Sequence, residues 1–248
     1  MSAAISIRAS RLGHPRGATV LSAIDLTIAR GERVALLGGN GAGKTTLLRA
    51  LVGLLPVDGE VRASGLAIRK PGDAVAAGVG LVFQNPDDQL FGASVLEDVR
   101  FGPCNQGLSP DEATRRAEES LAQLGIASLA ERSIETLSFG EKKRACLAGV
   151  LAMRPSVLLL DEATAGLDPA GETAFVALLA SLCKERGLTL LSATHAIDLV
   201  PSLADRVLVL SDGKLVADGT PRVVFAQTGL LAHARLRAPS PPFREAAG

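Results

Sequence analysis

The chain has 248 residues and equal numbers, 26 each, of basic (Lys plus Arg) and acidic (Asp plus Glu) side chains, so its formal net charge is zero. This length can bury a core without disulfide bonds, and the balanced charge gives no basic surplus that would favour nucleic acid as the main partner. Cys104, Cys146 and Cys183 stand far apart with no Cys-x-x-Cys pair, which argues against a zinc site or a disulfide framework and suits a reducing compartment. The apolar runs are far shorter than the ~20 residues of a membrane-spanning helix, so we expect any contact with a membrane to go through partners.

Strand-like segments open the chain. Residues 4–8, 21–28 and 33–37 are short apolar runs separated by turns, and we predict a strand for each. The third run leads through a glycine-rich loop into residues 45–52, whose apolar spacing predicts a helix that ends near Gly53. A strand, a glycine-rich loop and a helix in this order form a phosphate-binding unit.

The glycine-rich loop fits the pattern G-x-x-x-x-G-K-[ST]. Its glycines let backbone N–H groups converge on phosphates, and the helix N-terminus adds a favourable dipole. Lys44 would place its charge on the β- and γ-phosphates of ATP, and the Thr45 hydroxyl would ligate Mg²⁺. The alternative is a glycine-rich turn with no ligand. The residues that we expect to contact ATP through this loop are Gly38, Gly39, Asn40, Gly41, Ala42, Gly43, Lys44, Thr45 and Thr46.

The middle of the chain changes to helical periodicity. From residue 94 to 153 the apolar spacing predicts a helical insert. Strand patterns return at residues 157–160, 189–192 and 206–210, and a helix is predicted from about 169 to 185. The fold class is therefore α/β with a mainly parallel sheet.

The end of the chain carries one more strand signal. Asp212-Gly213 follows the last strand pattern and precedes a further apolar run, which predicts a terminal hairpin. Beyond Phe225 the pattern is lost, and the Pro-rich residues 238–243 are expected to be mobile.

Two acids follow the predicted strand at residues 157–160, at the edge where open α/β sheets bind ligands. Asp161 would hold Mg²⁺ through water, and Glu162 would polarise the attacking water. In phosphoryl transfer the protein mainly positions the reactants and stabilises the developing charge. A solvated strand end with no ligand is the alternative. Together with the glycine-rich loop, these acids predict a nucleoside triphosphatase without fixing its family.

Residues 137–144, Leu-Ser-Phe-Gly-Glu-Lys-Lys-Arg, resemble the signature sequence of ABC proteins, which is L-S-G-G-Q in most members. Phe139 and Glu141 depart from that sequence. Ser138 would cap a helix, and Gly140 would allow a phosphate to approach closely. The resemblance implies that this phosphate belongs to ATP held by the opposite subunit, whereas an ordinary helix cap is the alternative for Ser138.

Three further motifs follow the ABC order. Gln84, after a strand pattern at residues 80–83, matches the Q-loop, Asp168 matches the D-loop, and His195 matches the H-loop switch. The resemblance implies that Gln84 contacts Mg²⁺ or the attacking water and that His195 contacts the γ-phosphate. Asp168 could also cap the helix that begins at Pro169, and His195 could be an ordinary strand-end histidine.

The ABC resemblance implies a fold and a division of the chain. The fold is α/β, an ABC-type P-loop NTPase core with a RecA-like, mainly parallel sheet, an N-terminal antiparallel β subdomain and an inserted α-helical subdomain. We expect residues 3–84 and 154–225 to form the ATP-binding core with the β subdomain, residues 85–153 the helical signature subdomain, and residues 226–248 a short C-terminal tail.

A soluble ABC ATPase that acts on DNA is the main alternative class. Such proteins insert long coiled coils between the Q-loop and the signature, whereas here only the 53 positions from 85 to 137 intervene. Translation-associated ABC ATPases usually carry two ATPase domains in one chain, and this chain has one. Glu162 and His195 together argue against a non-hydrolysing regulator.

The adenine contact departs from the ABC pattern. ABC subunits usually stack adenine on an aromatic residue upstream of the P-loop lysine, but this chain contains no Tyr or Trp. His14 stands at the corresponding place, 30 positions before Lys44 (44 − 14). An imidazole can stack but has a smaller face, so whether His14 touches adenine stays open.

Residues 83–91, Phe-Gln-Asn-Pro-Asp-Asp-Gln-Leu-Phe, together with residues 141–144, resemble the ATPases of energy-coupling factor (ECF) importers. They are most similar to the CbiO group that serves cobalt transport, with nickel and biotin relatives near. The resemblance implies ATP and Mg²⁺ as ligands and a homodimer, or a pair with a similar ATPase. It also implies two membrane partners, a transmembrane coupling component and a substrate-binding component, a peripheral place at the cytoplasmic face of the cell membrane, and no nucleic acid.

Within that segment, Asp87 and Asp88 stand beside Leu90 and Phe91. This small acidic and apolar surface would receive an Arg-bearing helix of the coupling component. A polar Asn-Pro-Asp-Asp turn with no partner is the alternative. Many relatives have a longer C-terminal extension that helps to join the two ATPases, whereas little follows the predicted hairpin here. We therefore expect dimerisation to depend largely on ATP.

Overall fold

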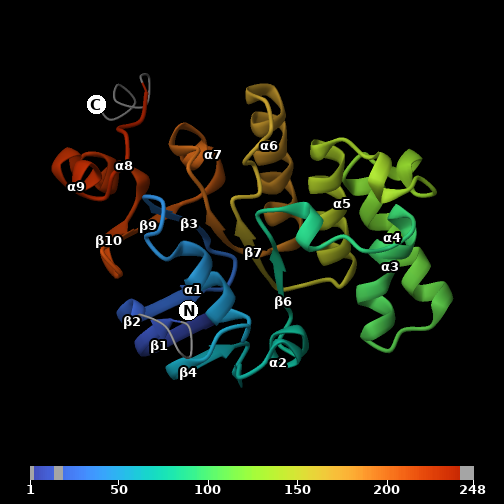
Figure 1. Cartoon of the computed structure of the whole chain (residues 1–248), viewed down its shortest axis with the longest axis horizontal. Helices are drawn as coiled ribbons and strands as arrows, with labels where there is room; N and C mark the ends of the chain where they lie inside the picture. Colours follow the sequence, from blue (N-terminus) through green and yellow to red (C-terminus); the bar gives the residue numbers. More distant parts are fainter. Residues whose placement is uncertain (1–2, 14–18, 241–248) are drawn as a thin grey trace.

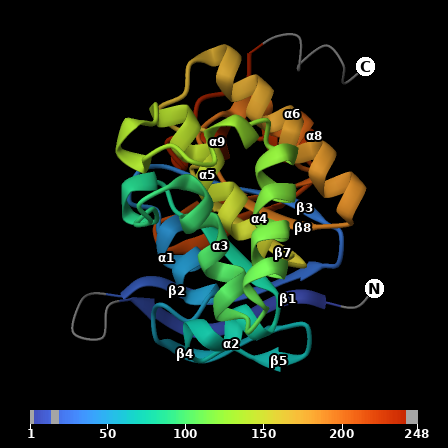
Figure 2. The same cartoon turned by 90° about the vertical axis from the view of Figure 1, so that its right-hand side faces the viewer.

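The computed structural model describes residues 3–13 and 19–240. Figure 1 shows a small sheet low in the view, a larger sheet above it, and the helices α3 to α5 on the right. Turned by 90°, Figure 2 shows the small sheet low in the view, below helix α1. This arrangement confirms the predicted α/β fold with an antiparallel β subdomain and an inserted helical subdomain.

The smaller sheet is antiparallel, in the order β2-β1-β4-β5. The sequence prediction missed β4 because its exposed positions carry Asp58 and Glu60, which make the run look polar. Gly59 of this strand has φ +148°, and a Cβ there would lie 2.1 Å from the carbonyl oxygen of Arg8, so only glycine fits. The strands of this sheet are β1 (Ala3–Gly13), β2 (Thr19–Ala29), β4 (Val57–Ala63) and β5 (Leu66–Ala67).

The larger sheet has the order β10-β9-β3-β8-β7-β6 and is parallel except for β10, which pairs antiparallel with β9 as the predicted hairpin. All residues of β7 and β8 are buried, which explains their unbroken apolar runs. The carboxyl ends of the parallel strands meet at one edge, so the residues after β3, β6, β7 and β8 come together there. The strands are β3 (Arg33–Gly38), β6 (Val79–Val82), β7 (Val157–Asp161), β8 (Thr189–Ala193), β9 (Arg206–Ser211) and β10 (Lys214–Gly219).

Helix α1 (Lys44–Leu51) packs between the two sheets. Leu47, Leu48 and Leu51 are at most 1% exposed and share an apolar cluster with residues of both sheets. Each such leucine contributes about 1.5–3 kcal/mol by burial, so the packing fixes the start of α1 beside the glycine-rich loop. The helices outside the insert are α2 (Pro71–Ala76), α6 (Pro169–Arg186), α7 (Val200–Leu203) and α8 (Pro221–Phe225), with a 3₁₀ turn η4 (Ile197–Leu199) before α7.

The segment between β6 and β7 is helical, as predicted, and packs around α5 (Phe139–Ala152). Its three longer helices each begin after a serine whose hydroxyl accepts a hydrogen bond from a main-chain N–H three residues on; the serines are Ser94, Ser109 and Ser138. The other elements are η1 (Pro86–Asp88), α3 (Val95–Asn105), α4 (Pro110–Gln123), η2 (Ala127–Leu129) and η3 (Ile134–Thr136). In the described part of the chain, no helix has the length and apolar character needed to cross a membrane.

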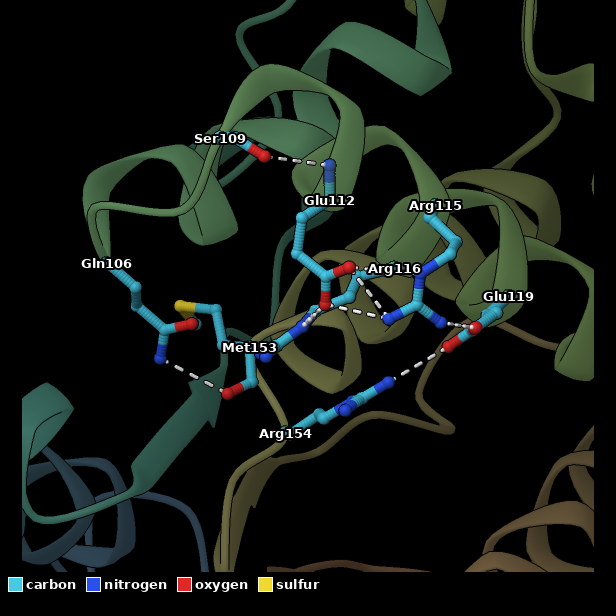
Figure 3. Close-up of polar contacts among 8 residues, drawn as sticks. All are labelled: Gln106, Ser109, Glu112, Arg115, Arg116, Glu119, Met153 and Arg154. Atoms are coloured by element: carbon cyan, nitrogen blue, oxygen red, sulfur yellow. Dashed lines mark hydrogen bonds and ion pairs between the residues drawn. The ribbon is translucent and has the colours of Figure 1, made fainter.

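Polar side chains connect α4 and the end of α3 to the segment after α5 (Figure 3). Arg115 of α4 forms ion pairs with Glu112, at 2.7 Å, and with Glu119. Arg154, just after α5, lies 3.1 Å from the second oxygen of Glu119. Gln106, just after α3, donates at 3.1 Å to the carbonyl oxygen of the residue before Arg154. We call the group Glu112, Arg115, Glu119 and Arg154 the outer network.

The predicted C-terminal tail, where the sequence pattern is lost, contains a further short helix. Helix α9 (Thr228–His233) follows α8, and its Leu231 is fully buried in an apolar cluster with residues of β3 and β9. The N–H of Ser240 donates at 2.7 Å to the carboxylate of Asp198, which holds the described part of the Pro-rich end against η4. A helix of six residues is too short for a periodic pattern to stand out, so the sequence does not reveal α9.

Candidate active site

The glycine-rich loop closes around the side chain of Lys44. Lys44 is 6% exposed, and its Nζ donates to the carbonyl oxygen of Gly38 at 2.9 Å. A Cβ on Gly38 would lie 2.6 Å from the carbonyl oxygen of Leu210 on β9. Gly43 precedes α1 with φ +101°, and a Cβ there would lie 2.5 Å from the Leu21 side chain. Gly38 and Gly43 are therefore required by the packing of the loop as well as by its predicted ligand.

Three donors from three separate motifs converge on the carboxylate of Glu162. Its Oε1 lies 2.7 Å from His195 Nε2 and 3.6 Å from Lys44 Nζ, and its Oε2 accepts from Gln84 Nε2 at 2.9 Å. His195 Nε2 also lies 3.3 Å from Lys44 Nζ, so this ring nitrogen donates to the carboxylate in one tautomer and accepts from the ammonium in the other. The fold thus brings together the four residues for which the sequence predicts a catalytic role. We call this group the catalytic cluster.

The main chain of Glu162 is in the left-handed region, with φ +50°. Its N–H donates at 3.0 Å to the carbonyl oxygen of Ala193, at the end of β8. This conformation costs a residue with a side chain about 1–2 kcal/mol, and such strain persists only where the surroundings hold it, often at functional sites. The position of the Glu162 carboxylate therefore depends on the hydrogen bond between its main chain and the end of β8.

Asp161 and Thr45 form a second polar pair beside the catalytic cluster. The Thr45 hydroxyl donates to Asp161 Oδ1 at 3.1 Å, and Asp161 is 2% exposed. Burial raises the pKa of Asp161, because its charged form loses hydration. Hydroxyl and carboxylate oxygens are the ligands that Mg²⁺ prefers, usually one or two of them together with substrate phosphates, so this pair fits the predicted ion. Within residues 3–13 and 19–240, no cluster of three or more His, Cys, Asp or Glu side chains offers a metal site made of protein alone.

The signature residues start helix α5 with a capping box. The Ser138 hydroxyl accepts from the N–H of Glu141 at 3.3 Å, and the N–H of Ser138 donates to Glu141 Oε2 at 2.7 Å. The bond from the main chain of Ser138 lowers the pKa of Glu141. The glutamate that replaces the usual glutamine therefore has a structural role here. Ser138 stays exposed, and Gly140 lies in the first turn.

Phe139 stands where most ABC signatures have glycine, and its ring packs on the D-loop of the same chain. A Cβ on Gly166 would lie 2.6 Å from Cε1 of Phe139. Phe139 is still 41% exposed. Asp168, the predicted D-loop residue, accepts from the N–H of Gly171 at 2.6 Å and so caps α6. The signature and the D-loop therefore share one surface.

The turn after Gln84 is built by its own polar side chains. Asn85 Oδ1 accepts from the N–H of Asp87 at 3.3 Å, and the Asn85 amide donates to Asp88 at 3.4 Å. Asp87 also lies 2.6 Å from Nζ of Lys142 on α5. The polar turn is thus present, and both acids remain exposed.

Leu90 and Phe91 lie in different surroundings. Leu90 is only 9% exposed and belongs to the apolar core of the helical insert, so the prediction that it contributes to a partner surface is wrong. Its N–H bonds to the carbonyl oxygen of Pro86, and this turn directs the side chain inward. Phe91 is 66% exposed, and its ring meets that of Phe101, 50% exposed, edge to face at 4.7 Å. Phe101, which the sequence analysis missed, extends the exposed apolar surface.

Lys143 is a buried residue to which the sequence analysis gave no role. It is 1% exposed, and its Nζ donates to the carbonyl oxygens of Gln84 and, at 3.3 Å, of Glu162. Burial lowers the pKa of Lys143. The helical period held a signal, because Cys146 and Leu147, three and four residues on, are also buried and place Lys143 on the inward face of α5.

The remaining predicted ATP contacts lie along the glycine-rich loop. Asn40 and Gly41 are exposed at its tip, Gly39 and Ala42 are half-buried, and Thr46 lies in the first turn of α1. His14, the predicted adenine contact, lies outside the described residues.

Comparison with known proteins decides the family of this chain. The sequence model of the ABC transporter family matches residues 21–165. The chain belongs to the ABC transporter family. This ABC ATPase is 46% identical over 230 residues to the energy-coupling factor transporter ATP-binding protein EcfA of Methanocaldococcus jannaschii, covering 91% of this chain and 82% of that protein.

Two solved structures extend the likeness of this ABC ATPase. One is cbiO1 of Clostridium perfringens, described as part of the ABC transporter complex cbiONQ, with a TM-score of 0.81, 39% identity and 96% of each chain covered. The other is a dimeric ATP-binding cassette in a post-hydrolysis state bound to ADP and Pi, with a TM-score of 0.79, 25% identity, and 88% of this chain and 98% of that chain covered. The predicted resemblance to ECF-type ATPases is confirmed, and ATP hydrolysis is the activity of the family.

Proposed function

We propose that this chain hydrolyses ATP to power an ECF-type importer of cobalt ions, as a dimer with two ATP sites shared between chains. The observation that carries the proposal is the convergence of Lys44, Gln84 and His195 on the carboxylate of Glu162. This arrangement places a positive charge and hydrogen-bond donors next to the carboxylate that would act as the base. Transfer of a γ-phosphoryl group to water requires all three.

In this proposal Glu162 orients and polarises the attacking water. Its side chain is 14% exposed and is held from two sides by Gln84 and His195, so the base is in position before the reaction starts. A phosphate offers charged acceptor oxygens like those of a carboxylate, so the donors that now contact Glu162 can turn to the γ-phosphate. Lys44, anchored on Gly38, then stabilises the charge that develops on the transferred group.

Thr45 and Asp161 would hold Mg²⁺, Asp161 through water, with Gln84 beside them. When bound, the ion supplies positive charge to the β- and γ-phosphate oxygens. The protein orients the groups that would hold the ion. The 3.1 Å hydrogen bond from the Thr45 hydroxyl fixes the Asp161 carboxylate beside the start of α1.

The signature residues are proposed to contact ATP held by a second copy, or by a similar ATPase. Ser138 and Gly140 lie at the start of a 14-residue helix, whose N-terminal dipole favours a phosphate. Phe139 and Asp168 belong to the same surface, and Glu141 holds Ser138 in place. The likeness to a dimeric cassette bound to ADP and Pi supports this pairing.

The exposed side chains Asp87, Asp88, Phe91 and Phe101 are proposed to receive a helix of the transmembrane coupling component. Arginines of that helix can pair with the two acids while its apolar residues cover the two rings. Together with the signature, this docking surface belongs to the helical subdomain that we assign to residues 85–153. Docking would make the chain a peripheral subunit at the cytoplasmic face of the membrane, and the place of cbiO1 in a cbiONQ complex supports this.

The proposed ATPase subunit does not contact the cargo, so its ATP-site residues do not select it. We favour cobalt because residues 83–91 resemble those of the CbiO group, and nickel and biotin are the alternatives. The test is to copurify the membrane partners with the tagged chain, reconstitute them in vesicles and measure ATP-dependent uptake of Co²⁺, Ni²⁺ and biotin. Uptake of Co²⁺ is expected; uptake of nickel or biotin instead would change the cargo, and failure of any membrane protein to copurify with the chain would contradict a transport role.

A further inference from the structure

Lys143 places a positive charge inside the protein, directly behind the catalytic cluster. It is among the largest fully buried side chains in the described residues, at 1% exposure. Its hydrogen bonds go to two main-chain carbonyl oxygens, and its Nζ lies 5.4 Å from the centre of the Phe139 ring. Burying an ammonium group is costly unless its donors are satisfied, and here carbonyls and a ring face satisfy them.

The two carbonyl oxygens belong to the residues that carry the catalytic side chains. Gln84 follows β6 and Glu162 follows β7, and these strands are neighbours, with Val82 opposite Leu160. Beyond the last paired residues the strands no longer bond to each other. Lys143 bonds to both main chains at this point, and on the other side the Gln84 amide reaches the Glu162 carboxylate at 2.9 Å.

Lys143 also joins this point to the signature. It stands five residues after Ser138 on α5, and its ammonium faces the ring of Phe139, which packs on Gly166 of the D-loop. The Lys143 side chain therefore contacts Gln84 of the Q-loop, Glu162 just after β7, and Phe139 of the signature.

We propose that Lys143 is a positioning residue for ATP hydrolysis: its buried ammonium holds the main chains of Gln84 and Glu162 in register, so that both side chains address the same water. The inference rests on the proposed function, because it takes Glu162 as the residue that polarises this water. The hydrogen bonds of Lys143 go to main-chain carbonyl oxygens of the protein. It acts through the strained, left-handed main chain of Glu162, which needs neighbours to hold it.

A role limited to filling the core makes a different prediction. Methionine has a similar length and an apolar end, and apolar side chains of similar volume often replace buried charges with little loss of stability. If Lys143 only filled space, Lys143→Met would therefore fold and turn over normally. If it positions the two main chains, the variant should fold and bind ATP but hydrolyse it poorly.

The test compares Lys143→Met, Lys143→Arg and the exposed control Lys184→Met in the full chain, with Mg²⁺ and ATP. For Lys143→Met we expect kcat per folded molecule to fall on the order of 100-fold, the effect of a small misplacement of a catalytic group, while KM and the Kd for ATP stay near the wild-type values. Arginine also presents donors to both carbonyls, so Lys143→Arg should recover at least part of the loss. Amide hydrogen exchange should accelerate around residues 84 and 162 in Lys143→Met and stay unchanged in α6.

Wild-type kcat per folded molecule in Lys143→Met would overturn the inference, as would a Kd for ATP that weakens as much as kcat falls. Glu162→Gln in the same assay separates the two levels of the account. Normal turnover by Glu162→Gln contradicts the proposed role of Glu162, whereas normal turnover by Lys143→Met beside an inactive Glu162→Gln contradicts only the positioning by Lys143.

Discussion

The catalytic cluster and the outer network are built from the same kinds of side chains in different surroundings. In the catalytic cluster, the side chains of Lys44 and Glu162 are 6% and 14% exposed. In the outer network, those of Arg115, Glu119 and Arg154 are between 44% and 53% exposed, along the surface of the helical insert (Figure 3). The outer contacts are as short as the inner ones, so distance does not separate the two groups.

The burial of the central pair separates them: Lys44 and Glu162 are largely withdrawn from water, although His195 beside them is 41% exposed. Exposed ion pairs exchange water contacts for protein contacts, lose side-chain freedom and are screened by salt, so their net effect is small. Groups that have already lost water depend on one another, and removing one leaves the rest uncompensated. We therefore expect changes in the catalytic cluster to appear in turnover, and matched changes in the outer network to appear hardly at all.

The largest effect is expected from Glu162→Gln, with Glu119→Gln as its matched control. Both changes replace a carboxylate with an amide of the same shape. Loss of a general base costs on the order of 100- to 10,000-fold in kcat, so Glu162→Gln should release almost no phosphate in a steady-state assay. Glu119→Gln should turn over at the wild-type rate. Equal losses in the two variants would show that the comparison has no functional meaning.

The next effect concerns the partner surface at the edge of the helical insert. Asp87→Lys with Asp88→Lys places positive charge where we expect arginines of the coupling helix, and like charges facing each other cost several kcal/mol. Transport by the reconstituted complex should fall roughly tenfold or more, while ATP binding by the isolated chain stays intact. The matched control is Glu118→Lys with Glu135→Lys, which changes the net charge equally on exposed positions of the insert. Unchanged transport in the Asp87 and Asp88 variant would remove these acids from the docking surface.

A smaller effect, on stability, is expected from Asp161→Asn without nucleotide. Because the pKa of folded Asp161 is raised, the folded chain keeps this proton to a higher pH than the unfolded chain does. Wild type therefore loses stability as pH rises from about 4 through the raised pKa. Asparagine removes this loss and still offers an oxygen to Thr45, so its Tm should exceed that of wild type at neutral pH, by about 2–4 °C for each kcal/mol regained.

The gain in Asp161→Asn should fade as pH falls toward about 4, where the aspartate is protonated in both states. Thermal unfolding at several pH values measures it, with the exposed Asp111→Asn as control. The same variant should lose Mg²⁺-dependent hydrolysis. A Tm below that of wild type at neutral pH would mean that the buried carboxylate stabilises the free chain.

The smallest effect is expected from the outer network. Glu119→Gln removes ion pairs with both Arg115 and Arg154. Because these side chains are about half exposed, the Tm should change by no more than about 2 °C. A larger drop at low salt that vanishes in high salt would show that the network acts as one unit in spite of its exposure.

Much of the catalytic edge could be predicted from the sequence, because its chemistry ties residue types to fixed places in the chain. A glycine-rich loop before a helix and two acids after an apolar strand are local patterns. Parallel strands bring their carboxyl ends together, which explains why Lys44, Gln84, Glu162 and His195 meet although they are far apart in the chain. The resemblance to the Q-loop and H-loop of ABC proteins selects Gln84 and His195, and the fold class explains why they meet Lys44 and Glu162.

The failures concern residues whose surroundings come from distant segments. Leu90 is apolar and lies beside exposed acids, and only the packing of the helical insert shows that it points inward. Lys143 looks like part of a basic surface run, because nothing local reveals the two carbonyl oxygens that its ammonium meets. Helix α9 depends on the packing of Leu231 against the larger sheet. A segment of six residues has no pattern that predicts this contact.

The shared ATP site is the central claim, and the oligomeric state of Glu162→Gln tests it most directly. Analytical ultracentrifugation of this variant should give a monomer without nucleotide and a dimer with Mg²⁺ and ATP, because the unhydrolysed nucleotide stays between the P-loop of one chain and Ser138 of the other. A variant that binds ATP and remains monomeric would contradict the claim that two chains complete each site.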